Sequence, residues 1–259
     1  MNDLSGRVGF GEVALSLVLV GVAVMISWRR RAGLEGDMLV ATFRSFAQLL
    51  AIGFVLEWVF GGGRGWVTPL ILGIMIGTAT MTSAGRAKRV PGAPVIAALS
   101  LCVATAATLG VLLVLGIVPA EPRSAIPLGS MIISNAMNTA SLVMSRLRDD
   151  LAASRREVEA RLSLGQTAAE AGAPWHRRAL RTGLLPIVDN TKVVGLVALP
   201  GAMTGMLLAG ASPAAAIRLQ LVVMYMLLAG NALAALVTGE LTIRRLFTPD
   251  HQLIRSLRR

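Results

Sequence analysis

Residues 66–118 read WVTPLILGIMIGTATMTSAGRAKRVPGAPVIAALSLCVATAATLGVLLVLGIV, two apolar runs on either side of a short basic stretch. The runs cover residues 66–84 and 93–118, and a membrane-spanning α-helix needs about 20 mostly apolar residues. Cytoplasmic loops between spans retain Lys and Arg. The pattern therefore predicts two spans joined by a cytoplasmic turn, which contains Arg86, Lys88 and Arg89.

The same pattern extends along the chain in both directions. Seven apolar segments are long enough to cross a bilayer, and they lie at about residues 10–28, 38–60, 66–84, 93–118, 125–145, 184–208 and 214–239. We therefore predict an all-α, polytopic transmembrane protein of about seven spans. A single transmembrane domain would comprise residues 1–259, and its one large polar segment, at about 146–183, would be cytoplasmic.

The positive charges predict the orientation of these spans. Basic residues follow the first, third, fifth and seventh predicted spans, whereas the other side of the membrane receives only Arg7, Arg64 and Arg123. This alternation places the N-terminus outside and the C-terminus in the cytoplasm. We expect a multi-pass protein of the cell (inner) membrane.

Composition agrees with a membrane protein and excludes other classes. The chain is 54% hydrophobic and 15% charged, whereas soluble domains contain about 25% charged residues. A net charge of +11 would suggest nucleic acid in a soluble protein, but here the charges lie in short loops where they meet anionic lipid. We expect a bilayer and no nucleic acid as the partner. The one cysteine, Cys102, excludes a disulfide framework.

Ionisable residues inside spans are candidates for function. The densest polar group is Asp189-Asn190-Thr191-Lys192. Asp189 and Lys192 are three residues apart, so they can pair on one helix face and reduce the cost of both charges. The pair is either a structural ion pair or part of an ion-coordinating or gating cluster, and both interpretations remain open. Asp189, Asn190 and Lys192 are therefore candidates for a transport path.

Two further features could line such a path. The stretch 134–141 is unusually polar for a span and contains Asn135 and Asn138, whose amides serve either interhelical packing or the path. Leu199-Pro200-Gly201 predicts a break or a kink in the sixth span, and transporters use broken helices at binding sites. Met203 follows this break, and its thioether is either apolar filler or a ligand for a soft metal. The sequence leaves the metal itself unknown.

Catalytic signatures are lacking. The sequence contains no GxxxxGK[ST] phosphate loop and no HExxH motif. We therefore predict a protein that is not an enzyme and that binds no cofactor itself. The cytoplasmic segment does contain Glu159-Ala160-Arg161-Leu162-Ser163-Leu164-Gly165, which resembles the EAA loop of ABC-transporter permeases. In those proteins a short helix docks into a groove of the ATP-binding subunit, so the resemblance implies coupling through Glu159, Ala160, Arg161, Leu164 and Gly165.

A longer pattern of short motifs occurs in order along the chain. It comprises Ser134-Asn135-Ala136-Met137-Asn138, Leu162-Ser163-Leu164-Gly165, Leu185-Pro186-Ile187-Val188-Asp189, Lys192-Val193-Val194-Gly195-Leu196-Val197, Leu199-Pro200-Gly201-Ala202-Met203-Thr204-Gly205 and His251-Gln252-Leu253. Together these motifs resemble the FetB/YbbM-type permease family. In that family the permease works with a separate ATPase called FetA, is linked to bacterial iron export and has plant relatives associated with aluminium tolerance.

The resemblance implies the membrane half of an ABC exporter of iron or another metal. It implies two copies of this chain and two ATP-binding subunits, which bind ATP and Mg²⁺. Two alternatives remain: a secondary transporter with Asp189 and Lys192 as ion-coupling groups, and a structural membrane scaffold, which would not need the polar groups of the fifth and sixth spans.

Overall fold

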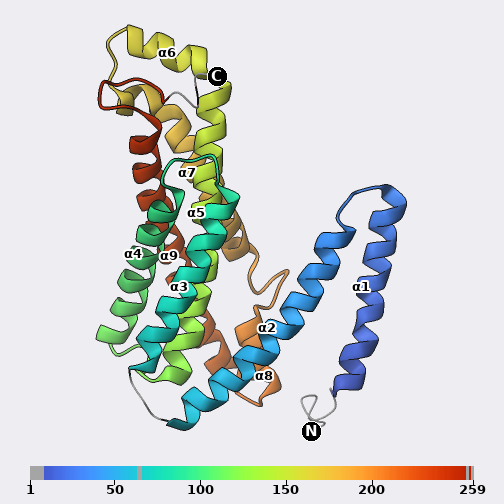
Figure 1. The fold of residues 1–259 in the computed structure, drawn as a ribbon. Helices are drawn as coiled ribbons and strands as arrows, with labels where there is room; N and C mark the ends of the chain where they lie inside the picture. The colour runs from blue at the N-terminus through green and yellow to red at the C-terminus, as the bar shows by residue number, and fades with distance from the viewer. Residues whose placement is uncertain (1–8, 63–65, 255–256, 258–259) are drawn as a thin grey trace. The chain divides into compact units, whose positions relative to one another are not determined.

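The computed structural model describes residues 9–62, 66–254 and 257. Helices account for most of these residues, and no strand occurs among them. The helices are α1 (Phe10–Arg30), α2 (Glu35–Gly62), α3 (Val67–Arg86), α4 (Ala93–Val114), α5 (Pro122–Ala153), α6 (Arg155–Ser163), α7 (Ala168–Val193), α8 (Gly201–Leu208) and α9 (Pro213–Leu246) (Figure 1). The predicted all-α class is confirmed.

Five helices have both the length and the apolar composition of a membrane span. They are α1, α2, α3, α4 and α9, and each overlaps a segment predicted from the sequence. α5 and α7 are long enough but more polar, because each combines a predicted span with part of the polar segment 146–183. The count of seven spans and the orientation of the termini remain predictions.

The predicted span 184–208 is not one helix. α7 ends at Val193 and α8 begins at Gly201, so the chain between them is non-helical. Gly195 takes a left-handed conformation (φ +83°), and its N–H donates to the carbonyl of Ala198 over 3.0 Å. Pro200 then disfavours a helical conformation of the preceding residue, Leu199, which is non-helical here. The predicted break is present, but it starts at Val194, five residues before Leu199.

The described residues divide into two compact units. The first comprises the residues up to 62, together with Gly205–Ala211. In it α1 and α2 pack on each other, and the Ser27 hydroxyl donates to Glu35 Oε1 over 2.8 Å at the turn between them. Apolar side chains on both helices are mostly exposed, as expected of surfaces that meet lipid. The assignment of the whole chain to one domain stays a prediction.

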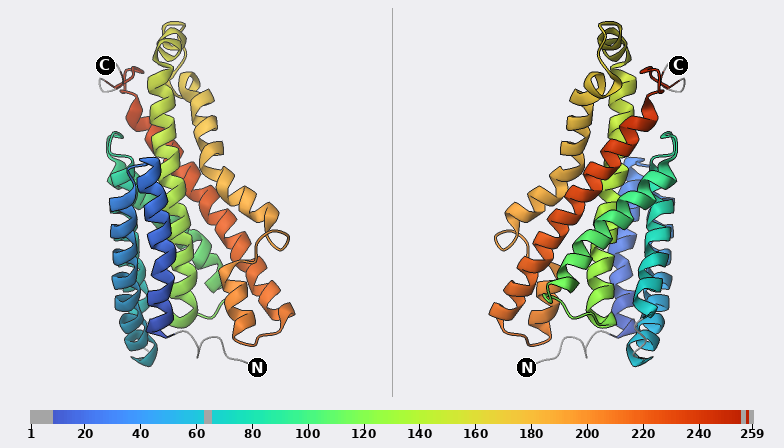
Figure 2. Two further views of the ribbon diagram at one scale, coloured as in Figure 1. Left: turned by 90° about the vertical axis from the view of Figure 1, so that its right-hand side faces the viewer. Right: turned by 90° about the vertical axis from the view of Figure 1, so that its left-hand side faces the viewer.

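The second unit, formed by the remaining described residues, is a helix bundle centred on α5 (Figures 1 and 2). α5 packs against α3, α4, α7 and α9. Glycines lie at its close crossings: a Cβ at Gly183 of α7 would overlap Val143 of α5, and one at Gly129 of α5 would lie 2.5 Å from Leu72 of α3. Small residues let helices approach closely inside membranes, where packing drives association.

The predicted cytoplasmic end of this bundle has its own apolar core. This core brings together the last turns of α5, the whole of α6, the first half of α7, the end of α9 and the segment after α9. Its fully buried side chains include Leu147, Leu151, Val158, Leu246 and Leu253. The C-terminal segment folds back after α9, because Phe247 and Leu253 form an antiparallel bridge. The polar segment 146–183 is thus a packed helical structure.

Candidate functional site

The predicted coupling residues lie on and just after α6, a nine-residue helix at the end of the bundle. Val158 on one face of α6 is fully buried in the core described above, and Leu162 packs against the same core. Ala160 lies on the exposed side of the helix. Leu164, directly after α6, exposes 83% of its surface. One side of α6 is therefore anchored, and the other side, which carries Arg156 and Glu157 beside Ala160, is exposed.

Charged side chains stabilise α6 and join it to α7. Glu159 Oε1 lies 2.8 Å from Arg155 Nε, and Glu157 Oε1 lies 2.9 Å from Arg161 Nη2, both pairs at the i, i+4 spacing that stabilises a helix. The Arg161 guanidinium also lies 5.4 Å from the centre of the Trp175 ring on α7, within the range of a cation–π interaction. Arg161 therefore joins α6 to α7.

The turn after α6 depends on Gly165. Its φ of +87° is a left-handed conformation that other residues adopt only with strain. α7 then begins with a capping box, in which the Glu170 backbone N–H donates to Thr167 Oγ1 and Glu170 Oε2 accepts from the Thr167 backbone. The Thr167 backbone N–H and then the Thr167 hydroxyl, which also donates to Glu170 Oε2 over 2.8 Å, hold the pKa of Glu170 below its ordinary value. The turn is thus a defined structure.

A groove of about 610 Å³ separates α6 from the C-terminal segment. Arg155, Glu159 and Leu162 line one side, and the stretch Asp250–Leu253 lines the other. The motif His251-Gln252-Leu253 was part of the family pattern, but the sequence assigned it no place. The structure places it beside the predicted coupling residues, because the bridge at Phe247 returns the chain to α6.

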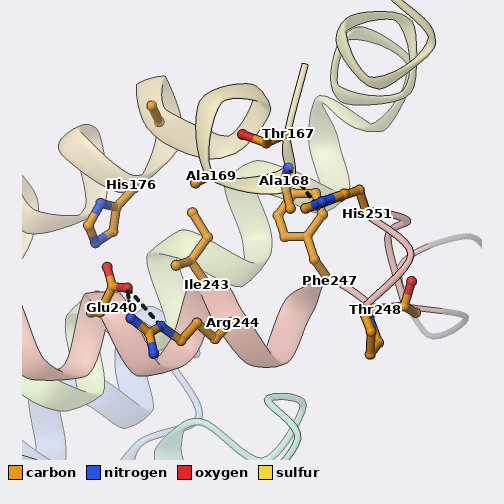
Figure 3. Close-up of a pocket in the computed structure, with 12 residues that line it drawn as sticks. Thr167, Ala168, Ala169, His176, Glu240, Ile243, Arg244, Phe247, Thr248 and His251 are labelled. Atoms are coloured by element: carbon orange, nitrogen blue, oxygen red, sulfur yellow. Dashed lines mark hydrogen bonds and ion pairs between the residues drawn. The ribbon is translucent and has the colours of Figure 1, made fainter. Parts of the chain in front are cut away.

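Both histidines of the chain, His176 and His251, line a second pocket of about 480 Å³ (Figure 3). The His251 Nδ1 atom accepts the N–H of Ala168 over 3.2 Å. Glu240 lies near His176 in the pocket and pairs with Arg244 over 2.7 Å. Burial lowers the pKa of His176, and the nearby Glu240 carboxylate opposes part of this shift. No cluster of three His, Cys, Asp or Glu side chains suited to a metal occurs in the described part of the chain.

The predicted pair on α7 is present. Lys192 Nζ lies 3.3 Å from Asp189 Oδ1, and the two side chains are 67% and 55% exposed. Asn190 is exposed as well. Met203 lies on α8, after the helix break, and is half-buried. The polar group formed by Asp189, Asn190 and Lys192 therefore lies on the surface of a single copy of the chain, immediately before the break in the predicted span.

The two asparagines of α5 have partners of their own. Asn138 Oδ1 accepts a hydrogen bond from Arg86 Nη1 at 2.7 Å, and Asn135 Nδ2 donates to the carbonyl of Met131 at 2.9 Å. No hydrogen bond or ion pair between described residues joins them to Asp189 or Lys192. α7 crosses α5 at Gly183 and then diverges from it (Figure 2). One copy of the chain therefore does not bring the two groups of path candidates together.

Sequence reasoning missed the buried polar contacts between helices. The Thr139 hydroxyl on α5 donates to Asn231 Oδ1 on α9 over 2.5 Å, and both residues are nearly fully buried. Thr238 of α9 donates to the hydroxyl of Ser100 on α4 over 2.8 Å. A signal was available for the first contact, because Asn231 is an isolated amide within an apolar run.

Comparison with known proteins identifies the family. The sequence matches the uncharacterised protein family UPF0014 over residues 10–247. It is 40% identical to the UPF0014 membrane protein STAR2 of Oryza sativa subsp. japonica, over 95% of this chain and 86% of that protein. It is 39% identical to the protein ALUMINUM SENSITIVE 3 of Arabidopsis thaliana, over 95% of this chain and 90% of that protein.

A bacterial relative carries the most specific name. The chain is 34% identical to the probable iron export permease protein FetB of Escherichia coli (strain K12), over 94% of each chain. No solved structure matches. The match over nearly the whole chain and the membrane-length helices lead to one conclusion: the protein is a multi-pass membrane protein and belongs to the UPF0014 family.

Proposed function

We propose that this chain is the membrane-spanning subunit of an ATP-driven exporter of iron or another metal. A separate ATP-binding-cassette subunit, similar to FetA, would bind ATP and Mg²⁺, and two copies of each subunit would form the transporter. The relative named as a probable iron export permease supports the transported species. The geometry of α6 supports the ATP-driven mechanism and carries the proposal.

α6 is suited to pass force from a partner to the membrane. It presents Ala160 and Leu164 outward, while Val158 and the Arg161–Trp175 contact hold it on the bundle. A push on its outer face therefore reaches α5 and α7 instead of bending a loop. α5 contains 32 residues, about 48 Å of helix at 1.5 Å per residue, so it extends from the partner's surface into the membrane.

The transport path would form between two copies of the chain. Asp189, Asn190 and Lys192 are exposed in one copy, and a paired charge exposed to lipid is unfavourable. A second copy facing these residues would enclose them in a polar path next to the break after Val193. Carboxylate and amide oxygens there, and the thioether of Met203, are possible ligands for a moving metal ion. The carboxylate of Asp189 would attract the cation, and Lys192 would limit how tightly it binds.

The alternative is a secondary transporter driven by an ion gradient. The exposed Asp189–Lys192 pair favours it, because a carboxylate beside an ammonium group can exchange partners with a coupling ion. This mechanism needs no ATPase and gives α6 no role in transport.

The first test is co-purification with a candidate ATP-binding-cassette subunit from the same genome. Glu159→Lys reverses a charge on the anchored helix, and Gly165→Leu forces a side chain into a left-handed turn. Both variants should lose the ATPase. Gly210→Leu is the matched control, because Gly210 has a nearly identical φ of +86° and, like Gly165, open space around its missing side chain. Retention of the ATPase by Glu159→Lys and Gly165→Leu would remove α6 from the mechanism.

A further inference from the structure

A third pocket, of about 340 Å³, lies at the turn between α3 and α4, on the side of α5. The turn contributes Arg86, Lys88 and Arg89, and α5 contributes Ser145, Arg148 and Asp149. All belong to the second unit of the structure. The pocket is separate from the α6 groove and from the path candidates Asp189 and Lys192.

The pocket is strongly cationic. Four of its side chains are positive and one, Asp149, is negative. Asp149 is 62% exposed and already pairs with Arg148 Nη1 over 2.8 Å. Arg148 is only 18% exposed, and its buried Nε atom has no hydrogen-bond partner among the described residues. Lys88 and Arg89 form no ion pair with another described residue, so the pocket has positive charge that no described carboxylate neutralises.

The frame that holds these cations is fixed. Ala87 and Val90 anchor the turn, because they are 3% and 4% exposed and pack with Ala140 and Met144 of α5. The Val90 N–H donates to the carbonyl of Ala87 over 2.9 Å. Arg86 is held by its hydrogen bond to Asn138 of α5. Lys88 and Arg89 thus extend as exposed side chains from a turn whose backbone is anchored.

The turn lies where lipid headgroups would be. α3 and α4 are both membrane-length apolar helices, so the few residues that join them lie at the boundary between bilayer and water. α5 continues past this turn toward α6 (Figure 1). Basic pockets between transmembrane helices on the cytoplasmic side bind phosphate-bearing lipid headgroups.

We propose that this pocket, which we call the α3–α4 pocket, binds the phosphodiester headgroup of an anionic membrane lipid such as phosphatidylglycerol. Lys88 and Arg89 attract the phosphate, and the Arg148 guanidinium adds positive charge to the wall of the pocket. The lipid's acyl chains extend along the apolar, exposed faces of α3 and α4, where Ile74, Val95 and Leu99 are at least 47% exposed. Free phosphate satisfies the cations but gains nothing from these apolar faces. The proposal does not depend on ATP-driven transport.

Native mass spectrometry of the full chain in a neutral detergent tests this site. The protein is given equimolar phosphatidylglycerol and phosphatidylcholine, and the occupancy of each lipid is measured. The wild type should retain phosphatidylglycerol preferentially. In Lys88→Gln/Arg89→Gln this occupancy should fall by roughly 25-fold, because each cation near an anionic lipid contributes a factor of about five. Arg177→Gln/Arg178→Gln is the control, since it removes the same charge from exposed positions on α7.

The outcomes separate a specific site from general attraction. Loss of phosphatidylglycerol in the Lys88/Arg89 variant alone supports the α3–α4 pocket. Equal loss in both double variants, or no preference for phosphatidylglycerol in the wild type, overturns it. Displacement of the lipid by millimolar inorganic phosphate would assign the site to a soluble phosphate. Release of the ATP-binding subunit from the Lys88/Arg89 variant, with unchanged lipid binding, would make the basic turn a protein contact instead.

Discussion

Gly183 is the position where a single methyl group should most clearly disturb the connection between α6 and the membrane. α7 crosses α5 here, and a Cβ would overlap Cγ2 of Val143 and lie 3.4 Å from the Thr139 carbonyl oxygen. Val143 is fully buried and β-branched, so it cannot turn away freely. Overpacking of this kind costs about 1–3 kcal/mol, so we expect Gly183→Ala to lower the free energy of unfolding by about 2 kcal/mol.

The double-mutant cycle with Val143→Ala makes this prediction specific. Val143→Ala removes two methyl groups, and with the cavity that remains it should also cost about 2 kcal/mol. It also removes the overlapping atom, so the double variant should lose about 2 kcal/mol in total, about half the sum of the two single effects. Unfolding by sodium dodecyl sulfate in mixed micelles measures these values. Gly77→Ala is the control, because its Cβ would meet no other atom within 4 Å. Additive effects of Gly183→Ala and Val143→Ala would refute the close crossing.

Three further predictions concern polar groups. Thr139→Val leaves the buried Asn231 Oδ1 without its donor and should cost about 1–3 kcal/mol in the same unfolding assay. Thr82→Val removes an exposed hydroxyl and should cost little, so equal effects of the two changes would contradict the buried bond. Asp189→Asn and Lys192→Met should each change the unfolding free energy by less than about 1 kcal/mol, because the proposed polar path between two copies keeps the pair hydrated. Each should nevertheless reduce transport, and a large loss of stability would make the pair structural. The pKa of His176 is lowered in the folded protein, so its contribution to stability is complete above the ordinary histidine pKa of 6.5 and falls as the pH drops below 6.5. The melting temperature of the His176→Gln variant should therefore depend less on pH between about 7.5 and 5.5 than that of the wild type. An unchanged pH profile would assign the effect to another group.

The sequence predicts the helical elements well because lipid restricts the choices. Within a bilayer a chain must satisfy its own backbone hydrogen bonds, so an apolar run of about 20 residues is a helix. The boundaries of α3 and α4 follow closely from this rule. The rule fails between Val194 and Pro200, where Gly195 takes a left-handed conformation inside an otherwise apolar stretch. Hydropathy does not register a local backbone conformation.

The candidate site was only partly predictable for a different reason. Glu159 to Gly165 and the Asp189–Lys192 pair are local in sequence, so spacing along a helix reveals them. The groove beside α6 also needs Asp250–Leu253, nearly 90 residues later, and the bond between Thr139 and Asn231 joins α5 to α9. Such contacts depend on how helices pack. The exposure of Asp189 and Lys192 was also not foreseen, because the sequence placed them in a low-dielectric environment.

The most direct test of the proposed function is metal transport in proteoliposomes that contain this chain with its ATP-binding subunit. Ferrous iron is supplied on the side of the ATPase, and its movement into the vesicles is measured with and without ATP. The proposal predicts iron accumulation that requires ATP, requires the second subunit and disappears in Gly165→Leu but not in Gly210→Leu. Iron movement by this chain alone, driven by an ion gradient and unchanged in Gly165→Leu, would contradict ATP-driven export and establish a secondary transporter.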